Sequence, residues 1–373
     1  MVAHFTHHVS NTLLAPLQPL IRDAFTLSYA QSGFLASAFF VAQGLSQAPI
    51  GILADRIGSR TVIIVGLIAT GAVMVLIGLS GGYWHLLLLL VLMGLIAGTY
   101  HAPAASLLAR TFPPERRGGA LGMHVVGGNL SFFATPLLAG GLAASTHDWR
   151  SPYLVFAIAP ILAGVFLFVT LPALREHAEH SSSAGLLKDL GSVIGVVGPL
   201  LSLAIVFQML YAAVYAFLAL YLVDARGFDP AAAAVLVAAP FIAGLAGAPI
   251  GGFLSDRVGR KPVIIVAIVL QGPLLYILTQ VPTMLIAPVL AVMGLVGAAR
   301  MPVIEGFLLD RAPANRRATT LGAYYFLAQE LGGFAAPVLG ILAVTFGIAG
   351  AYVNLGLVAS AMSLAILLLA RRL

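Results

Sequence analysis

The stretch QAPIGILADRIGSRTVIIVGLI (47–68) recurs as GAPIGGFLSDRVGRKPVIIVAIV (247–269), with Asp55 matching Asp256. Self-similarity at a fixed offset indicates an internal duplication. Because the copies extend over about a hundred residues of each half, the chain is predicted to consist of two halves with the same fold. Three further pairs of segments keep the offset of 200 or 201 residues: GLIAGTYHAPAASLLAR (94–110) and GLVGAARMPVIEGFLLDR (294–311), ERRGGALG (115–122) and NRRATTLG (315–322), TPLLAGGLA (135–143) and APVLGILA (336–343).

The composition places these halves in a membrane. Of 373 residues, 60% are hydrophobic and 9% charged, whereas a soluble domain carries about 25% charged residues. These values exclude an ordinary soluble domain and a disordered chain. The absence of cysteine excludes disulfides, thiolate nucleophiles and cysteine-ligated metals.

The apolar stretches between charge clusters are long enough for membrane-spanning helices of roughly 20 residues. The predicted fold is an all-α membrane protein with twelve transmembrane helices in two pseudo-symmetric six-helix halves. The halves are predicted at 1–172 and 192–373, joined by a cytoplasmic linker at 173–191. We expect the true start to lie upstream of Met1, because the first span leaves no tail. The predicted spans are 2–21, 31–54, 61–79, 85–108, 119–144, 152–172, 192–222, 231–254, 262–280, 283–309, 318–345 and 350–370.

The basic residues predict the orientation. With both termini in the cytoplasm, 15 of the 19 Lys and Arg residues lie on the cytoplasmic side and three lie outside. Cytoplasmic loops of membrane proteins carry such an excess. The net charge of +6 therefore reflects topology and predicts no nucleic-acid partner. The expected location is a plasma membrane, the inner membrane of a bacterium.

Two copies of one loop motif carry a family resemblance. GILADRIGSR (51–60) and GGFLSDRVGRK (251–261) resemble the cytoplasmic loop signature of the major facilitator superfamily. The resemblance implies a monomeric transporter without cofactor, with its substrate site between the halves. The glycines of the motif are expected to let helices approach closely. The alternative interpretation is that the loop only sets the topology through its positive charge. The implied conformational latch comprises Gly51, Asp55, Arg56, Gly58 and Arg60, and Gly252, Asp256, Arg257, Gly259 and Arg260.

Within that family the chain is similar to the fosmidomycin-resistance-type efflux carriers. The similar stretches are HFTHHVSNTLLAPLQPLIRDAF (4–25), YHAPAASLLAR (100–110) and GMHVVGGN (122–129). The sequence also departs from family patterns. His7 and His8 replace an Asn-Asp pair, Leu90 stands where many proton antiporters have Arg, and Thr135-Pro136 replaces Gly-Pro. These departures leave the direction of transport and the proton-carrying residue open.

Polar residues inside spans are costly and usually functional, and in the first half they are mostly histidines. Span 1 carries a polar helical stripe, which either lines a cavity or caps the cytoplasmic helix end. Span 4 contributes Tyr100 and His101 next to Pro103, a combination that predicts an irregular turn. His124 in span 5 can shuttle protons or pack. The stripe comprises His4, His7, His8, Asn11 and Gln18.

The second half carries polar residues in the equivalent spans 7 and 10. Gln208, Tyr211 and Tyr215 share one helical face, which either contacts the ligand or forms helix–helix hydrogen bonds. Arg300 keeps its charge about 16 Å from the cytoplasmic helix end and needs an anionic partner. We expect Arg300 to pair with Glu330 of span 11, which leaves Glu305 free to titrate. A static ion pair is the alternative.

These features predict a non-enzymatic secondary transporter. The leading interpretation is a proton-coupled antiporter that exports a small amphiphilic or drug-like molecule by alternating access. The alternatives are an importer of a small organic anion and a non-transporting receptor or assembly protein on the same fold. GLSG (78–81) resembles a protease motif but falls next to a turn, and EHAEH (176–180) lies in the linker without a zinc-site spacing. Without a Walker-type loop, direct ATP use is not expected.

Overall fold

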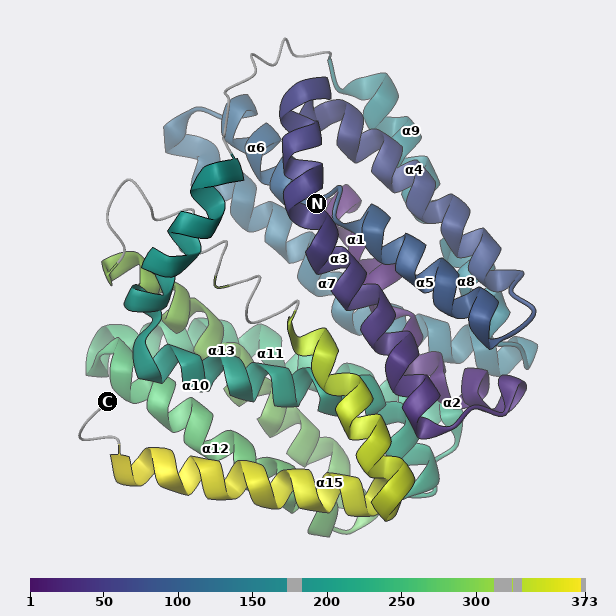
Figure 1. The fold of residues 1–373 in the computed structure, drawn as a ribbon, viewed down its shortest axis with the longest axis vertical. Helices are drawn as coiled ribbons and strands as arrows, with labels where there is room; N and C mark the ends of the chain where they lie inside the picture. Colours follow the sequence, from purple (N-terminus) through teal and green to yellow (C-terminus); the bar gives the residue numbers. More distant parts are fainter. Residues whose placement is uncertain (173–182, 312–323, 325–330, 370–373) are drawn as a thin grey trace. The chain divides into compact units, whose positions relative to one another are not determined.

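The computed structural model describes residues 1–172, 183–311, 324 and 331–369, and every regular element in these ranges is helical (Figure 1). The predicted all-α fold class is confirmed. The chain divides into two compact units: the first contains Met1–Leu27 and Phe34–Ser183, the second Ser28–Gly33 and Ala184–Leu373. The main division between Ser183 and Ala184 falls inside the predicted linker.

Three spans of the first half are each built from two shorter helices. Span 1 is interrupted at Leu13, span 4 at Gly98–Tyr100 and span 6 at Ala157. The break in span 4 is the irregular turn predicted beside Pro103. The helices of this half are α1 (Val2–Thr12), α2 (Leu14–Phe25), α3 (Tyr29–Ile57), α4 (Ser59–Gly78), α5 (Tyr83–Ala97), α6 (His101–Thr111), α7 (Pro114–Thr146), α8 (Arg150–Phe156) and α9 (Ile158–Thr170).

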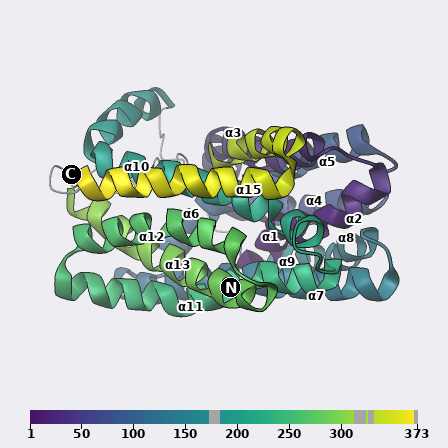
Figure 2. The same cartoon turned by 90° about the horizontal axis from the view of Figure 1, so that it is seen from below.

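The helices of the second half are longer. In this unit α11 packs against α13, and α12 lies between α13 and α15, as the side view shows (Figure 2). The loop expected between spans 11 and 12 is a kink at Gly347, whose φ is +69°. The helices are α10 (Ser183–Asp224), α11 (Pro230–Val258), α12 (Arg260–Gln280), α13 (Ile286–Arg311) and α15 (Ala335–Leu369), with short 3-10 helices at Thr283–Leu285 and Leu331–Phe334.

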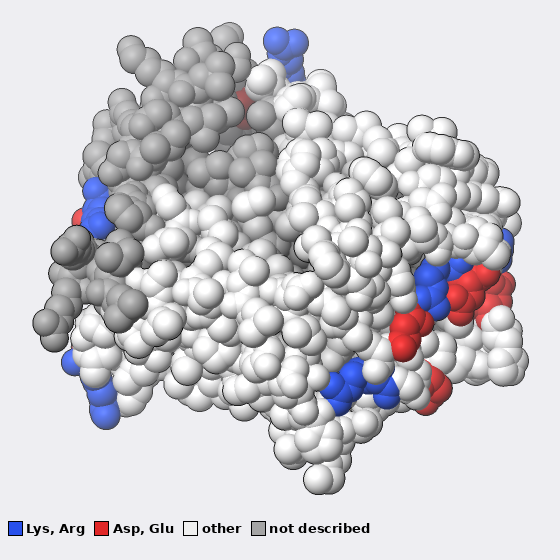
Figure 3. Space-filling model, turned by 60° about the horizontal axis from the view of Figure 1, so that its bottom comes forward, with Lys and Arg blue, Asp and Glu red and all other residues white. Residues whose placement is uncertain are grey.

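Most of these helices can cross a membrane. Within the described ranges, nine helical stretches are long and apolar enough, with α5 and α6 counted as one stretch and α8 and α9 as another, or ten if the bent pair Tyr29–Gln47 and Pro49–Ile57 forms one span. Large apolar side chains such as Val65, Leu162 and Val338 are exposed on them, as expected for a lipid-facing surface. On the face shown in Figure 3, the charged side chains of the described residues form small groups on a largely uncharged surface. Residues 318–323 and 325–330 of predicted span 11 lie outside the described residues.

Equivalent glycines hold equivalent helices together in the two units. A Cβ atom on Gly94 of α5 would lie 2.2 Å from the carbonyl oxygen of Phe39 on α3. A Cβ atom on Gly294 of α13 would lie 1.9 Å from the carbonyl oxygen of Pro240 on α11. Only glycine permits backbones to approach so closely. The duplication seen in the sequence therefore reappears as the same helix contact in each unit.

Contrary to the prediction from the sequence, the glycines of the loop motif do not all allow two helices to approach closely. Gly51 and Gly252 meet no described atom within 4 Å of a built Cβ, so that explanation is wrong for them in the described structure. Gly58 and Gly259 each form the single residue between two helices, with φ of +93° and +89°. Only glycine adopts such backbone angles without strain, which explains its presence in both loops.

Gly259→Ala is expected to destabilise the protein by about 1–3 kcal/mol, because alanine is strained at this backbone conformation. The measurement is unfolding of the purified protein in detergent. Gly252→Ala is the matched control: it lies in the same motif but within a helix and in open space. The control should keep or gain stability. Equal losses in both variants would contradict the conformational explanation.

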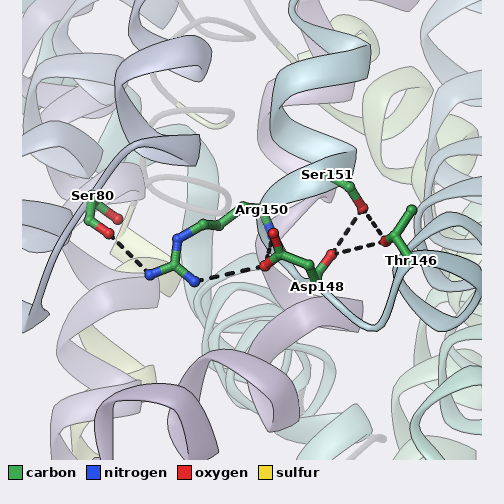
Figure 4. A network of polar contacts seen from close by, with 5 residues as sticks. All are labelled: Ser80, Thr146, Asp148, Arg150 and Ser151. Atoms are coloured by element: carbon green, nitrogen blue, oxygen red, sulfur yellow. Dashed lines mark hydrogen bonds and ion pairs between the residues drawn. The ribbon is translucent and has the colours of Figure 1, made fainter.

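A polar network secures the turn between α7 and α8, at the other end of α4 from Gly58 (Figure 4). Arg150 donates to the carbonyl oxygen of Ser80 at 3.2 Å and lies 3.6 Å from the Asp148 carboxylate. The guanidinium also lies over the Trp149 ring, 4.6 Å from its centroid. The hydroxyls of Thr146 and Ser151 complete the turn. Arg150 therefore ties the start of α8 to the end of α4.

Candidate functional site

Five histidines from three segments of the first unit converge in its interior. His4, His7 and His8 come from α1, His101 begins α6, and His124 lies on α7. The three α1 side chains are buried, with exposed fractions of 7%, 2% and 9%. This burial favours the interpretation that these histidines face the interior of the unit over the interpretation that they cap the helix in solvent. The break between α5 and α6 directs His101 towards α1.

Hydrogen-bond distances connect the histidines in pairs. His4 Nδ1 lies 2.8 Å from the backbone oxygen of His124, which can only accept, so this nitrogen donates. The Nε2 atoms of His8 and His4 are 3.0 Å apart, and those of His7 and His101 are 3.3 Å apart. Each neutral imidazole has one N–H and one lone pair. In each of these two pairs, one Nε2 atom therefore donates and the other accepts.

Aromatic stacking and a glycine position the rings. Tyr100 stacks on His7 with a centroid distance of 4.6 Å, and His124 stacks on His4 at 4.0 Å. On α7, a Cβ atom at Gly128 would lie 2.6 Å from the His4 ring. The space that Gly128 leaves is thus filled by the imidazole of His4.

The other two residues of the predicted polar stripe, Asn11 and Gln18, lie further along the chain, on α1 and α2. Asn11 is partly exposed and accepts a hydrogen bond from Ser10, while Gln18 is buried on α2. No described contact brings Asn11 into the histidine cluster. The expected stripe thus divides into the histidine cluster and two residues beyond it.

An open pocket of about 600 Å³ leads towards this cluster. His124 forms part of its wall and stacks on His4. The pocket therefore gives water-sized molecules a path to the edge of the cluster. Its other lining residues are Met1, Leu108, Phe112, Arg116, Gly119, Ala120 and Met123.

In the second unit, Arg300 on α13 is fully enclosed, with 1% of its surface exposed. Its guanidinium donates to the backbone oxygen of Ala204 at 2.9 Å and to the side-chain oxygen of Gln208, both on α10. Its Nε atom has no hydrogen-bond partner among the described residues. Within those residues, no carboxylate forms a salt bridge with Arg300.

The sequence predicts Glu330, not Gln208, as the partner of Arg300. Glu330 lies outside the described residues, so that ion pair stays a prediction. Glu305 is half-buried on α13, and Tyr324 interacts electrostatically with both Glu305 and Arg300. The pairing of Arg300 with Gln208 was not predicted, because a buried guanidinium is expected to pair with a carboxylate.

The tyrosines of α10 favour the helix-packing interpretation. Tyr211 donates to the backbone oxygen of Gln271 on α12 at 3.0 Å. Tyr215 is partly buried and its ring contacts Tyr211 and Phe241. On this face, Gln208 is the residue that contacts Arg300.

Some of the loop arginines have contacts within their own unit. Arg60 donates to the backbone oxygens of Phe168 and Leu171, both at 2.7 Å, and so caps the end of α9. Arg260 pairs with Asp310 at 3.1 Å, and Arg257 lies over the Phe253 ring. Arg56 and Asp256 are exposed, and Asp55 is half-buried. The proposed latch between halves stays a prediction.

Comparisons with known proteins agree with this architecture. The profile described as Major Facilitator Superfamily matches residues 1–233 and 200–373. The multidrug resistance protein MdtG of Escherichia coli O1:K1 / APEC is 28% identical over 318 residues, covering 83% of this chain and 76% of that protein. The similarity to fosmidomycin-resistance-type carriers is not specifically supported by this relative and stays a prediction.

Two solved transporters share the fold at low sequence identity. A bacterial homologue of the human lysosomal transporter Spinster, inward-facing and occupied, superposes with a TM-score of 0.81 at 19% identity, covering 99% of this chain and 95% of that one. A mutant of the nucleoside transporter NupG gives 0.80 at 14% identity, covering 100% and 97%. The profile match over both parts of the chain, on a fold that these transporters share, assigns the protein: it is a multi-pass membrane transporter, not an enzyme, and the chain belongs to the Major Facilitator Superfamily.

Proposed function

We propose that the protein is a secondary active exporter of small amphiphilic or drug-like molecules, driven by a proton gradient. The observation that carries this proposal is the same in each unit: polar side chains of the first and fourth spans converge. In the first unit, His4 and His8 meet His101. In the second, Gln208 meets Arg300. Polar groups retained at membrane depth mark substrate and ion pathways, and the similarity to MdtG favours export.

The proposed mechanism is alternating access. The two halves rock about a central site, and protonation of Glu305 or of a nearby histidine favours one state. The loops containing Asp55 and Asp256 latch that state. The protein acts as a monomer in the bacterial inner membrane with both termini in the cytoplasm, and the finer resemblance to fosmidomycin-resistance-type carriers belongs to the same proposal.

A second candidate is the import of a small organic anion. The observation that favours it is the buried charge of Arg300, which has a free Nε and no carboxylate partner among the described residues. An anionic substrate group would supply the missing partner. The two candidates share the site and differ in direction.

The first experiment identifies the substrate class. Thermal stability of the detergent-purified protein is measured against phosphonates, organic anions, lipophilic cations and sugars at two pH values. A ligand at a hundredfold excess over Kd stabilises the folded state by about 2.7 kcal/mol. The stabilising compounds are then tested for transport.

The transport test uses right-side-out proteoliposomes with an acidic exterior, so that protons enter. We expect a preloaded substrate to leave the vesicles faster than without the gradient. Accumulation of external substrate would identify the importer instead. Binding without gradient-dependent flux in either direction would contradict both and favour the receptor interpretation.

A further inference from the structure

We propose that His4, His8 and His101 form a binding site for one divalent transition-metal ion of the zinc class. One ligand nitrogen from each side chain lies within 4.8 Å of the other two. The three rings come from two segments, α1 and the start of α6. The inference goes beyond the proposed function, because metal binding requires neither a gradient nor a transported substrate.

The nitrogen positions suit a single ion. Two nitrogens on a tetrahedral zinc ion, each at about 2.0–2.1 Å, lie about 3.3 Å from each other. The Nε2 atoms of His4 and His8 are 3.0 Å apart. His4 and His8 are also one helical turn apart, the spacing that places two imidazoles on one face of a zinc-binding helix. A nitrogen of His101 completes the group, whose ligand atoms all lie within 4.8 Å of one another.

The surroundings of His4 resemble those of a metal ligand. Its Nδ1 donates to the backbone oxygen of His124, so its Nε2 carries the lone pair and faces His8. Metal-bound histidines usually donate their other nitrogen to an oxygen in this way, which orients the ring. His8 must change its protonated nitrogen: its Nε2 donates to His4 in the 3.0 Å contact, and metal binding at Nε2 moves that proton to the buried Nδ1, which has no hydrogen-bond partner among the described residues.

The type of ligand selects the type of ion. Imidazole suits zinc, copper, iron and nickel, whereas magnesium and calcium prefer oxygen ligands. The three ligands are neutral when they bind, so the ion keeps its double positive charge. A three-histidine site also leaves a fourth coordination position. That position favours an anionic oxygen donor, and the pocket beside His124 provides a path for entry.

The test uses the full chain in detergent, without a polyhistidine tag, titrated with Co²⁺ and then with Zn²⁺. We expect one Co²⁺ per chain, with the intense visible absorption of a four-coordinate ion, and displacement by Zn²⁺. His8→Gln and His101→Gln should each weaken Co²⁺ binding about 100-fold or more. His85→Gln and His147→Gln, at exposed positions, are the controls and should bind normally.

A variant that keeps all three histidines tests whether the position of the His4 ring matters. It keeps the proposal testable if the histidine variants fail to fold. Gly128→Ala places a Cβ atom 2.6 Å from the His4 ring and should weaken binding about tenfold. Gly141→Ala, in open space on the same helix, should not. Unchanged binding in His8→Gln and His101→Gln would overturn the proposal. Loss of binding on replacement of His177 and His180 would overturn it as well, because the linker would then hold the ion.

Discussion

Glu305→Gln is expected to abolish gradient-driven export while substrate exchange across the membrane continues. Glu305 is half-buried on α13 and interacts electrostatically with Tyr324, as Arg300 does. A carboxyl group at this position, near a permanent positive charge, can change its charge by binding a proton. Glutamine has nearly the same shape as protonated glutamate but cannot release the proton. The variant therefore keeps one charge state in both conformations.

Two assays in proteoliposomes separate these effects. Gradient-driven efflux depends on a proton cycle, whereas exchange of labelled for unlabelled substrate at equal pH does not. Asp23→Asn is the matched control, since it makes the same chemical change at an exposed helix end, where the side chain is 64% exposed. The control should retain driven efflux. If Glu305→Gln also retains it, the proton is carried by another residue.

The helices and the duplication were predictable because they depend on local composition and on copied segments. The close contacts at Gly94 and Gly294 follow from the repeat, since equal segments pack equally. The breaks at Leu13 and Ala157 were not predicted, because an apolar run gives no sign of where a helix is interrupted. Charge clusters indicate where a span ends but not where a helix is interrupted within it.

The site was only partly predictable. The spacing of His4 and His8 indicated one helical face, and Pro103 indicated the turn at His101. The approach of His124 to His4 depends on how α7 packs against α1, which no local pattern encodes. The space at Gly128 is the one signal in that segment that could have indicated it. Partners from distant helices require the tertiary structure.

Arg300→Met is expected to weaken binding of anionic ligands by about 30-fold or more, the factor that corresponds to a loss of about 2 kcal/mol. Its effect on stability should be small or favourable. Arg300 is 1% exposed and has no carboxylate partner among the described residues. Removing a buried charge that has no described carboxylate partner avoids the cost of its desolvation. The acceptors left behind are a backbone oxygen inside α10 and the partly exposed Gln208 side chain.

Arg226, a partly buried arginine of the second unit, serves as a control because the opposite result is expected for it. Arg226 donates to the backbone oxygens of Leu278 and Thr279, at 3.3 and 3.2 Å, and to that of Val281, at the end of α12. Because these oxygens have no further helical partners, Arg226→Met should lower the unfolding free energy by about 1–3 kcal/mol and leave ligand affinity unchanged. Unfolding and ligand titration of both variants in detergent distinguish the two roles. If Arg300→Met loses stability as Arg226→Met does, and keeps its affinity for anions, then Arg300 holds α13 to α10 and does not bind substrate.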